Sequence, residues 1–322
     1  MPKTRFAKEL KDKDVVNEVF LVKYSAVVQA RNGKPYLNCV LSDRSGDVES
    51  RVWENAEAAA TVLVKGTFVR VEGRVSVFQG KRQFILNAFT QVPASQIEMK
   101  EFVPEARCDV DALYLKVLEY ARSLENPFSR ELALKVLTDE DVSARLRQAP
   151  AAKSVHHAYR GGLIEHMVSI AGILDDLSKH YGPVLDRDLL MLGGFFHDIA
   201  KLWELEYALT TDYTDEGRLV GHLVMGVELV ERVMNTIPEF PRHLRLLVKH
   251  LILAHHGELE YGSPKRPKCL EALVVHYVDD LDSKINAIQG FIEKDENPGD
   301  WTLLNKMYER YFYKGPKSVS KQ

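Results

Sequence analysis

Histidine is absent from the first 155 of the 322 residues, and all eleven histidines lie between His156 and His276. Side chains suited to binding transition metals are therefore concentrated in the second part of the chain. Cysteine is scarce, and Cys39, Cys108 and Cys269 lie far apart. Three such cysteines have neither zinc-ribbon spacing nor the even number of a disulfide framework. We therefore expect no disulfide-stapled fold, and a reducing compartment, the cytoplasm.

Long hydrophobic runs are also missing. No apolar stretch approaches the roughly 20 residues that a membrane-spanning helix needs. The N-terminus leads into a charged stretch without the apolar core of a secretory signal. Apolar residues make up 45% of the chain and charged residues 28%, which is typical of globular proteins. We expect no membrane association, and a length of 322 residues allows two domains.

The net charge of −3 is unevenly distributed. Residues 1–100 carry 16 Lys and Arg and 11 Asp and Glu, a balance of +5, whereas the remainder carries 27 and 35, a balance of −8. A basic first part indicates a polyanionic partner, and an acidic, histidine-rich second part indicates metal. Chance variation in surface charge explains an excess of this size equally well.

The first part of the chain has the pattern of short strands separated by turns. Strands are expected at 15–28, 36–41, 48–53, 68–78 and 83–92, with a short alanine-rich helix at 55–63. Turn signals occur at 31–34, 43–47 and 79–82. Three strands, a helix and two strands is the order of a five-stranded Greek-key barrel. The segment resembles the OB-fold nucleic-acid-binding domains, although OB folds also bind sugars or proteins or support a neighbouring domain.

Aromatic and basic side chains are interleaved on these expected strands. The aromatic residues are Tyr36, Trp53, Phe78 and Phe84, and the basic residues are Lys34, Arg51, Arg74, Lys81 and Arg82. A basic groove with aromatic platforms holds single strands by backbone charge and base stacking. For any single aromatic residue, the barrel core is the more frequent location. Tyr36, Trp53, Phe78 and Arg82 are the predicted substrate contacts of this domain.

After a polar segment, 93–107, which we interpret as a linker, the periodicity becomes helical. Helices are expected at 110–124, 129–138, 140–148, 162–180, 186–202, 221–235, 241–255, 269–291 and 299–312, with no strand-rich segment. The predicted domains are therefore an all-β barrel at 1–92 and an all-α bundle at 108–313. The small, polar and basic tail 314–322 is expected to be disordered.

The segment 195–201 places an adjacent His197-Asp198 pair inside an apolar run, where two polar groups need a partner. Further histidines and acids follow on successive expected helices: His166, His222, His255, His256 and Asp279. A helical bundle can aim such residues at one interior point. Histidine with carboxylate suits Mn²⁺, Fe²⁺, Mg²⁺ or Zn²⁺. Lys201, one turn after Asp198, is placed to stabilise phosphate charge in a transition state.

Residues 150–290 resemble the HD-domain phosphohydrolase superfamily in the order H…HD…H…HH…D. The resemblance implies that His166, His197, Asp198 and Asp279 are the core ligands. It also implies that His222, His255 and His256 are extra ligands of two-metal members, with Asp198 bridging two ions. One histidine of the last pair, His255 or His256, could lie outside the coordination sphere. Asp280 and Asp282 are alternatives to Asp279, and Asp282 is also a candidate outer partner.

Two further loops contain polar residues near this pattern. Residues 155–162 precede the first ligand, and the position facing the pocket in HD domains makes His157 and Arg160 candidate substrate contacts. A purely connecting loop fits the sequence equally well. Lys265, Arg266 and Lys268 form a similar basic loop after His256. The histidines outside the pattern are expected to be structural or surface residues: His180, His243, His250 and His276.

The whole chain, an OB barrel followed by a linker and an HD domain, resembles the YhaM-type 3′-to-5′ exoribonucleases. The segments that carry this resemblance are 155–166 and 197–201. It implies Mn²⁺-dependent trimming of RNA 3′ ends, some activity on single-stranded DNA, and a homo-oligomer. In the implied mechanism, water activated by two ions attacks the terminal phosphodiester, with Asp198 and Lys201 as catalytic groups.

Two other functions remain open from the sequence. The first is an HD phosphohydrolase of nucleotides or cyclic dinucleotides, whose barrel serves assembly. That protein would hydrolyse mononucleotides without needing residues 1–100. The second is a nucleic-acid-binding adaptor with an inert HD domain, which the complete set of metal ligands disfavours.

Overall fold

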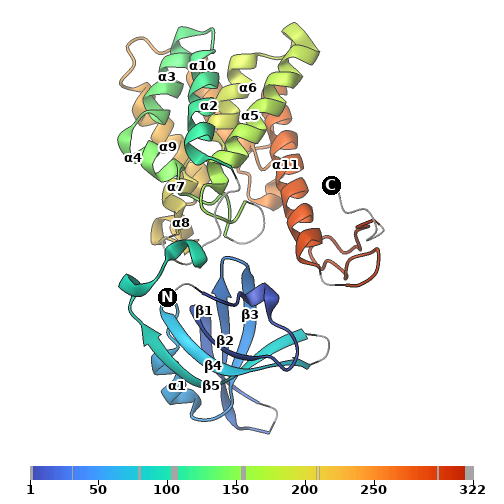
Figure 1. The fold of residues 1–322 in the computed structure, drawn as a ribbon. Helices are drawn as coiled ribbons and strands as arrows, with labels where there is room; N and C mark the ends of the chain where they lie inside the picture. Colours follow the sequence, from blue (N-terminus) through green and yellow to red (C-terminus); the bar gives the residue numbers. More distant parts are fainter. Residues whose placement is uncertain are drawn as a thin grey trace. The chain divides into compact units, whose positions relative to one another are not determined.

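The computed structural model describes residues 3–30, 32–78, 81–102, 108–153, 157–207, 209, 211–295 and 297–315. They form two compact units (Figure 1). The first comprises Met1–Glu105 with Tyr207–Thr210, and the second Ala106–Glu206 with Thr211–Gln322. Within the predicted linker, residues 103–107 lie outside the described part of the chain. The predicted disordered tail also lies outside it from residue 316 onward.

The first unit is a closed five-stranded barrel, as the sequence pattern predicts (Figure 1). Its elements are β1 (Val15–Gln29), β2 (Pro35–Asp43), β3 (Gly46–Val52), α1 (Ala56–Val62), β4 (Phe68–Phe78) and β5 (Lys81–Val92). The order around the barrel is β1-β2-β3-β5-β4. The β3–β5 pair is parallel and the other neighbours are antiparallel. This topology confirms the expected OB-fold barrel.

Alternate side chains of the strands fill the barrel, because successive residues of a strand point to opposite faces. Phe20, Leu37, Leu41 and Phe84 are fully buried there. A second buried cluster consists of Val19, Leu21, Phe68 and Phe102, and Leu209 packs against it.

Phe102 lies within the predicted linker 93–107. Its ring lies 5.0 Å from that of Phe68, centroid to centroid. The preceding residues form two short 3-10 helices, η2 (Ala94–Gln96) and η3 (Met99–Glu101). The segment up to Phe102 is therefore part of the first unit, since it contributes a buried aromatic ring to it.

The second unit is helical, as predicted (Figure 1). Its helices are α2 (Val110–Arg122), α3 (Pro127–Leu137), α4 (Glu140–Leu146), α5 (Gly162–Tyr181), α6 (Arg187–Phe196), α7 (Lys201–Glu204), α8 (Asp215–Leu219), α9 (His222–Met234), α10 (Arg242–Ala254) and α11 (Leu270–Lys294). The side chains of Asp109, Asn126 and Asp139 accept backbone hydrogen bonds at the starts of α2, α3 and α4. Helix α5 packs against α2, α6 and α11, and α10 packs against α6, α9 and α11.

Three expectations for this unit are corrected. The predicted helix 186–202 is interrupted, because turns with Ile199 N–H bonded to Phe196 O and Lys201 N–H bonded to Asp198 O separate α6 from α7. The predicted helix 299–312 is absent: the side chain of Asn305 accepts bonds from two following amides, which holds a turn instead. A hairpin of two short strands, β6 (Leu205–Glu206) and β7 (Asp212–Tyr213), interrupts the helices.

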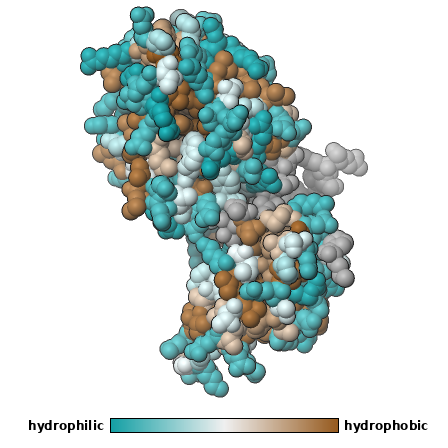
Figure 2. Space-filling view, turned by 90° about the vertical axis from the view of Figure 1, so that its left-hand side faces the viewer, coloured by the Kyte–Doolittle hydropathy of each residue, from teal (hydrophilic) through white to brown (hydrophobic). Residues whose placement is uncertain are grey.

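The visible surface consists of hydrophilic residues around smaller hydrophobic areas (Figure 2). Among the described residues, no helix combines the length and apolar character required to cross a lipid bilayer.

Candidate metal centre

Helix α6 is buried from Asp188 to Phe196, and His197 and Asp198 follow at its end in the interior of the bundle. Both side chains are almost completely buried, with residue exposures of 1% and 3%. Gly193 and Gly194 allow the neighbouring helices to approach α6 closely. A Cβ atom at Gly193 would lie 2.6 Å from Val275 Cγ2 of α11, and one at Gly194 would lie 3.0 Å from Leu174 Cδ1 of α5.

A first group of potential metal ligands contains His166 of α5, His197, Asp198 and Asp279 of α11. One ligand atom from each lies within 4.8 Å of all the others. His166 Nε2 is 3.2 Å from Asp279 Oδ1 and 3.3 Å from His197 Nε2. The Asp198 Oδ2 atom is 3.6 Å from His197 Nε2 and 3.8 Å from His166 Nε2.

A second group contains His222 at the start of α9 and the pair His255-His256 after α10. His222 Nε2 and His255 Nε2 lie 3.4 and 3.5 Å from Asp198 Oδ1. Asp198 therefore turns one carboxylate oxygen to each group. His255 is buried and His256 is half-buried, so His255 lies deeper in the centre.

The ring orientation of each histidine is fixed by a bond at its Nδ1 atom. The acceptors are Asp282 for His166, the carbonyls of Gly193 and Gly194 for His197, Glu204 for His222, the carbonyl of Ile252 for His255 and that of Tyr261 for His256. A carbonyl or carboxylate only accepts, so Nδ1 carries the hydrogen. In a neutral ring, Nε2 then keeps the lone pair that a metal requires.

The donor set fits a divalent cation. Asp198 Oδ1, His222 Nε2 and His255 Nε2 are buried and have no hydrogen-bond partner within the described structure. Buried polar atoms without partners are costly. All three are lone-pair atoms that face one another, so a cation placed among them would satisfy them together. Nitrogen and oxygen ligands without cysteine match Mn²⁺, Fe²⁺, Mg²⁺ or Zn²⁺.

The surroundings of the centre shift the pKa values of its titratable groups in different directions. Burial opposes the charge on Asp198, but Lys201 Nζ, 2.6 Å from Asp198 Oδ2, and the neighbouring histidines hold the pKa of Asp198 well below its ordinary value. Burial would lower the pKa of His166, yet hydrogen bonds with Asp279 and Asp282 raise it to about 9. Burial lowers the pKa of His255 to about 4. His255 is therefore neutral near pH 7 and ready to act as a ligand.

The predicted substrate contacts lie in different environments. His157 is buried, and its ring nitrogens are bonded to the Tyr159 hydroxyl and to Asp282. Arg160 is exposed. In the barrel, Arg82 Nη1 donates to the carbonyl of Leu10 at 2.8 Å and to that of Lys8 at 3.2 Å, which ties it to the N-terminal segment.

The aromatic residues on the barrel surface include a stacked pair, in which Trp53 is exposed and Tyr36 is half-buried. The rings of Tyr36 and Trp53 lie 4.9 Å apart at an interplanar angle of 29°. The Arg51 guanidinium lies 5.4 Å from the Tyr36 ring and 5.6 Å from the Trp53 ring. Phe78 is also exposed, at the end of β4, whereas Phe84 belongs to the core. We call Tyr36, Arg51 and Trp53 the aromatic platform.

Several supporting residues have no sequence signal that reveals them. Glu204 accepts bonds from both the Nδ1 atom and the backbone amide of His222. His276 donates to the carbonyl of His255, and its ring lies where a Cβ of residue 257 would be, only 2.2 Å away. Glycine at position 257 thus permits the turn after His256.

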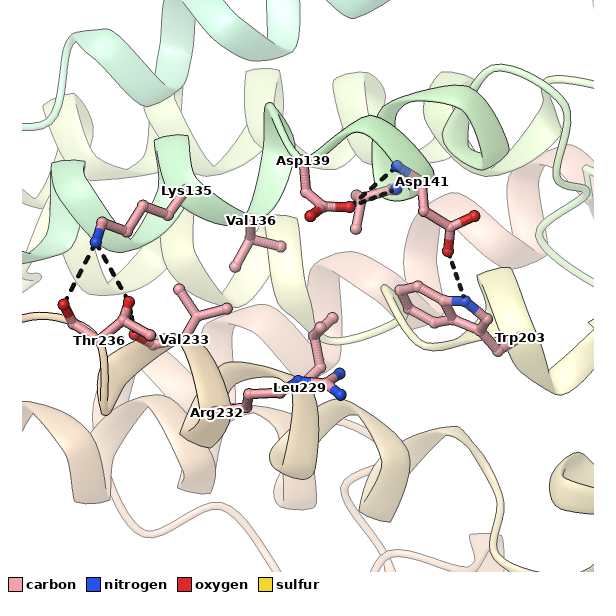
Figure 3. Close-up of a pocket in the computed structure, with 10 residues that line it drawn as sticks. Lys135, Val136, Asp139, Asp141, Trp203, Leu229, Arg232, Val233 and Thr236 are labelled. Atoms are coloured by element: carbon pink, nitrogen blue, oxygen red, sulfur yellow. Dashed lines mark hydrogen bonds between the residues drawn. The ribbon is translucent and has the colours of Figure 1, made fainter.

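A separate cavity of about 600 Å³ opens between α3, α4, α7 and α9 (Figure 3). Several of its polar groups are bonded to one another: Lys135 Nζ to Thr236, and Trp203 Nε1 to Asp141. None of its lining residues belongs to the two ligand groups. We therefore place the chemistry at Asp198 and not in this cavity.

Family models match two parts of the chain. The OB-fold nucleic acid binding domain matches residues 18–92, and the HD domain matches residues 163–284. Proteins named 3′-5′ exoribonuclease YhaM are similar over most of the chain. The protein from Oceanobacillus iheyensis is 34% identical over 91% of this chain and 92% of its own. Those from Bacillus subtilis and Bacillus pumilus are both 32% identical, over 93% and 96% of this chain and 94% and 98% of their own.

Among solved structures, the second OB-fold domain of replication protein A from Methanococcus maripaludis is 16% identical. It covers 29% of this chain and 98% of its own, with a TM-score of 0.24.

Proposed function

The chain belongs to the family of the 3′-5′ exoribonuclease YhaM, and we propose that it hydrolyses single-stranded RNA from the 3′ end at the centre around Asp198. The observation that carries this proposal is the position of Asp198 between the two ligand groups, with one oxygen toward each. We extend the proposal to single-stranded DNA as a second substrate and to a cytoplasmic location.

We propose two divalent ions, with Mn²⁺ favoured. His166, His197, Asp198 and Asp279 would hold one, and His222, His255, His256 and Asp198 the other. When bound, such a pair supplies an activated water and neutralises phosphate charge. The Asp198 carboxylate stays ionised beside Lys201, so it remains available as a shared ligand. Lys201 adds a buried positive charge beside the reacting phosphate.

The barrel is proposed to hold the strand that the helical unit digests. The aromatic platform offers the exposed Trp53 ring and the half-buried Tyr36 ring for base stacking, and the Arg51 guanidinium for the phosphate backbone or the bases. Phe78 is a further exposed ring, and Arg160 a candidate phosphate contact. The assigned roles are strand binding for residues 1–92, to whose unit the segment up to Phe102 also belongs, and hydrolysis for residues 108–313.

We extend the proposal to a homo-oligomer. Helix α11 exposes apolar side chains at spacings of three and four residues: Leu270, Leu273, Tyr277, Leu281 and Ile285. Such a stripe on one side of a helix is typical of a surface that packs against another chain.

The test is a time course on a 5′-labelled single-stranded RNA with added Mn²⁺. Wild-type protein is compared with the double variant His197→Ala/Asp198→Ala and with His243→Ala, a control outside both ligand groups. We expect wild type and the control to give a ladder of shortening labelled products, and the double variant to leave the RNA intact. RNA that stays intact with wild type, while mononucleotides are hydrolysed, would support the nucleotide phosphohydrolase instead.

A further inference from the structure

Beside the metal centre lies a second polar cluster, formed by the buried residues His157 and Asp282 and the half-buried Ser169. Asp282 lies one helical turn after Asp279 on α11, and the residue is only 9% exposed. Its Oδ2 atom is 2.8 Å from His166 Nδ1 and 3.1 Å from His157 Nε2. The Ser169 hydroxyl donates to the other oxygen, Oδ1. One carboxylate thus receives three donors, two of them from histidines.

The positions of the protons follow from these contacts. Two histidine nitrogens and the Ser169 hydroxyl all lie at hydrogen-bonding distance from the Asp282 carboxylate, which accepts from all three. His166 therefore carries a hydrogen on Nδ1, and His157 carries one on Nε2. In a neutral His157 ring, Nδ1 is then an acceptor. It lies 2.9 Å from the hydroxyl of Tyr159, which supplies the hydrogen.

The backbone also holds His157 in place. Its φ angle is +42°, a conformation that residues other than glycine rarely adopt. The His157 amide donates to Asn286 Oδ1 of α11 at 2.8 Å. The carbonyl of His157 approaches Gly162 so closely that a Cβ there would lie 1.9 Å from it. A strained conformation with fixed contacts on both sides points to a defined role for the ring.

Two other roles fit this cluster less well. His157, His166 and Asp282 are close enough to hold an ion of their own. However, three donors occupy most of the roughly four acceptor positions of the Asp282 carboxylate, and His166 Nδ1 carries a hydrogen. Direct substrate contact by His157 is also disfavoured, because the residue is 4% exposed and both ring nitrogens are bonded.

We propose that Asp282 is a positioning residue that fixes the His166 ring with Nε2 toward Asp198 and Asp279, and that His157, supported by Tyr159, holds Asp282 in turn. This inference rests on the proposed metal-binding role of His166. A carboxylate behind a histidine ligand fixes its tautomer and makes the ring a stronger donor. Through the contacts from Tyr159 to His157 and from His157 to Asp282, the loop before α5 also supports the metal ligand His166.

The experiment measures Mn²⁺ binding by calorimetry and electron paramagnetic resonance, on the full chain and without substrate. Asp282→Ala removes the acceptor of both histidines, and Asp282→Asn retains a carbonyl acceptor but removes the charge. The matched control is Asp280→Ala, because Asp280 lies on the same helix but pairs with Lys284 at 2.7 Å. Unfolding temperatures of the metal-free proteins report whether each variant folds.

We expect Asp282→Ala to weaken one Mn²⁺ site by about 10- to 100-fold, and Asp282→Asn to weaken the same site less. Asp280→Ala should bind as wild type does. As a second route to the same conclusion, His157→Ala leaves the Asp282 carboxylate in place and should weaken that site by a smaller factor. Tyr159→Phe should have the smallest effect, since it removes only the last donor in this series of hydrogen bonds.

Two results would overturn the inference. One is wild-type affinity at every site in folded Asp282→Ala and His157→Ala. The other is an equal loss at all sites together with a lowered unfolding temperature, which would indicate a general structural role. Failure of the proposed function looks different, because wild-type protein would then bind no Mn²⁺, or His166→Ala would bind it unchanged.

Discussion

The five histidines of the centre are held at Nδ1 by six acceptors, and these acceptors decide which ring nitrogen faces the interior. Backbone carbonyls hold His197, His255 and His256, whereas carboxylates hold His166 and His222. A carbonyl is provided by the helix itself and needs no particular side chain. The two carboxylates are side chains whose loss by mutation would release a ring, so metal binding is more vulnerable there.

Single residues of the centre could be predicted from the sequence to different degrees. His197-Asp198 is recognisable because two polar groups interrupt an apolar run. Glu204 and Asp282 contact their histidines across 18 and 116 residues of sequence. Contacts at such separations depend on how helices pack, which no local pattern records. His157 is another such case. The sequence predicts that it lies near the pocket, but it does not reveal that its ring contacts Asp282.

The titration of His166 gives a prediction for the pH dependence of metal binding. In the folded protein without metal, hydrogen bonds with Asp279 and Asp282 raise the pKa of His166 from its ordinary value of 6.5 to about 9. The protonated ring therefore stabilises the metal-free fold fully below pH 6.5, and this contribution is lost as the pH rises through about 9. A metal needs the same Nε2 atom without its proton. His197, His255 and His256, whose pKa values are lowered by burial, are already neutral.

Mn²⁺ binding near pH 7 should accordingly release about one proton from His166, and the affinity should rise with pH until about pH 9. Calorimetric titrations in buffers of different ionisation enthalpy count the released protons. The expectation fails if the measured heat does not depend on the buffer, or if the affinity falls as the pH rises from 7 to 8.

At the scale of elements, periodicity predicted the barrel strands and most helices, because each buries one regular face. Periodicity failed where the chain makes a tight turn in place of a continuous helix. The apolar pattern continues from α6 into α7, yet the chain turns between them, because residues 196–201 bond in tight turns instead of continuing the helix. Likewise, Asn305 holds a turn in place of the expected last helix.

The packing of α6 against α11 gives a prediction at this scale. Gly193→Ala would place a methyl group 2.6 Å from Val275 Cγ2, so the helices must separate or distort. We expect the free energy of unfolding to fall by about 1–3 kcal/mol. Because α6 and α11 both carry ligands, Mn²⁺ affinity should fall as well. Thermal and denaturant unfolding measure the first effect, and calorimetry measures the second.

Gly290→Ala on α11 is the matched control for this substitution. No heavy atom lies within 4 Å of the Cβ that it would add. Alanine is favoured over glycine inside a helix by about 1 kcal/mol, so this variant should be slightly more stable and bind Mn²⁺ normally. A Gly193→Ala protein as stable as wild type would show that α6 and α11 are not packed as closely as described.

At the scale of the whole molecule, the chain joins a basic strand-binding barrel to an acidic catalytic bundle. Charge balance alone predicted this division only weakly. The stronger signal was the change of periodicity, from short alternating strands to long amphipathic helices, because each architecture imposes its own spacing of apolar residues. In the proposed function, the barrel contributes affinity for a long strand, whereas the bundle contributes the reaction at the end of that strand.

This division predicts that the aromatic platform affects long substrates only. Trp53→Ala removes an exposed ring that stacks on Tyr36 beside Arg51, so binding of a single-stranded RNA long enough to reach the barrel should weaken by about 1–3 kcal/mol. Hydrolysis of a dinucleotide, which occupies only the metal centre, should be unchanged. The measurement is KM and kcat for both substrates, and KM for the long RNA should rise while kcat stays constant.

Trp301→Ala provides the control for this prediction. Trp301 is 54% exposed, against 48% for Trp53, and its ring lies 5.1 Å from that of Tyr313 in the helical unit. It therefore matches Trp53 in exposure and in having an aromatic neighbour, but it belongs to the unit that is not proposed to stack bases. An equal rise in KM for both variants would mean that exposed tryptophans act nonspecifically. A lower kcat on the dinucleotide with Trp53→Ala would mean that the barrel shapes the reaction itself, and the proposed division of roles would then fail.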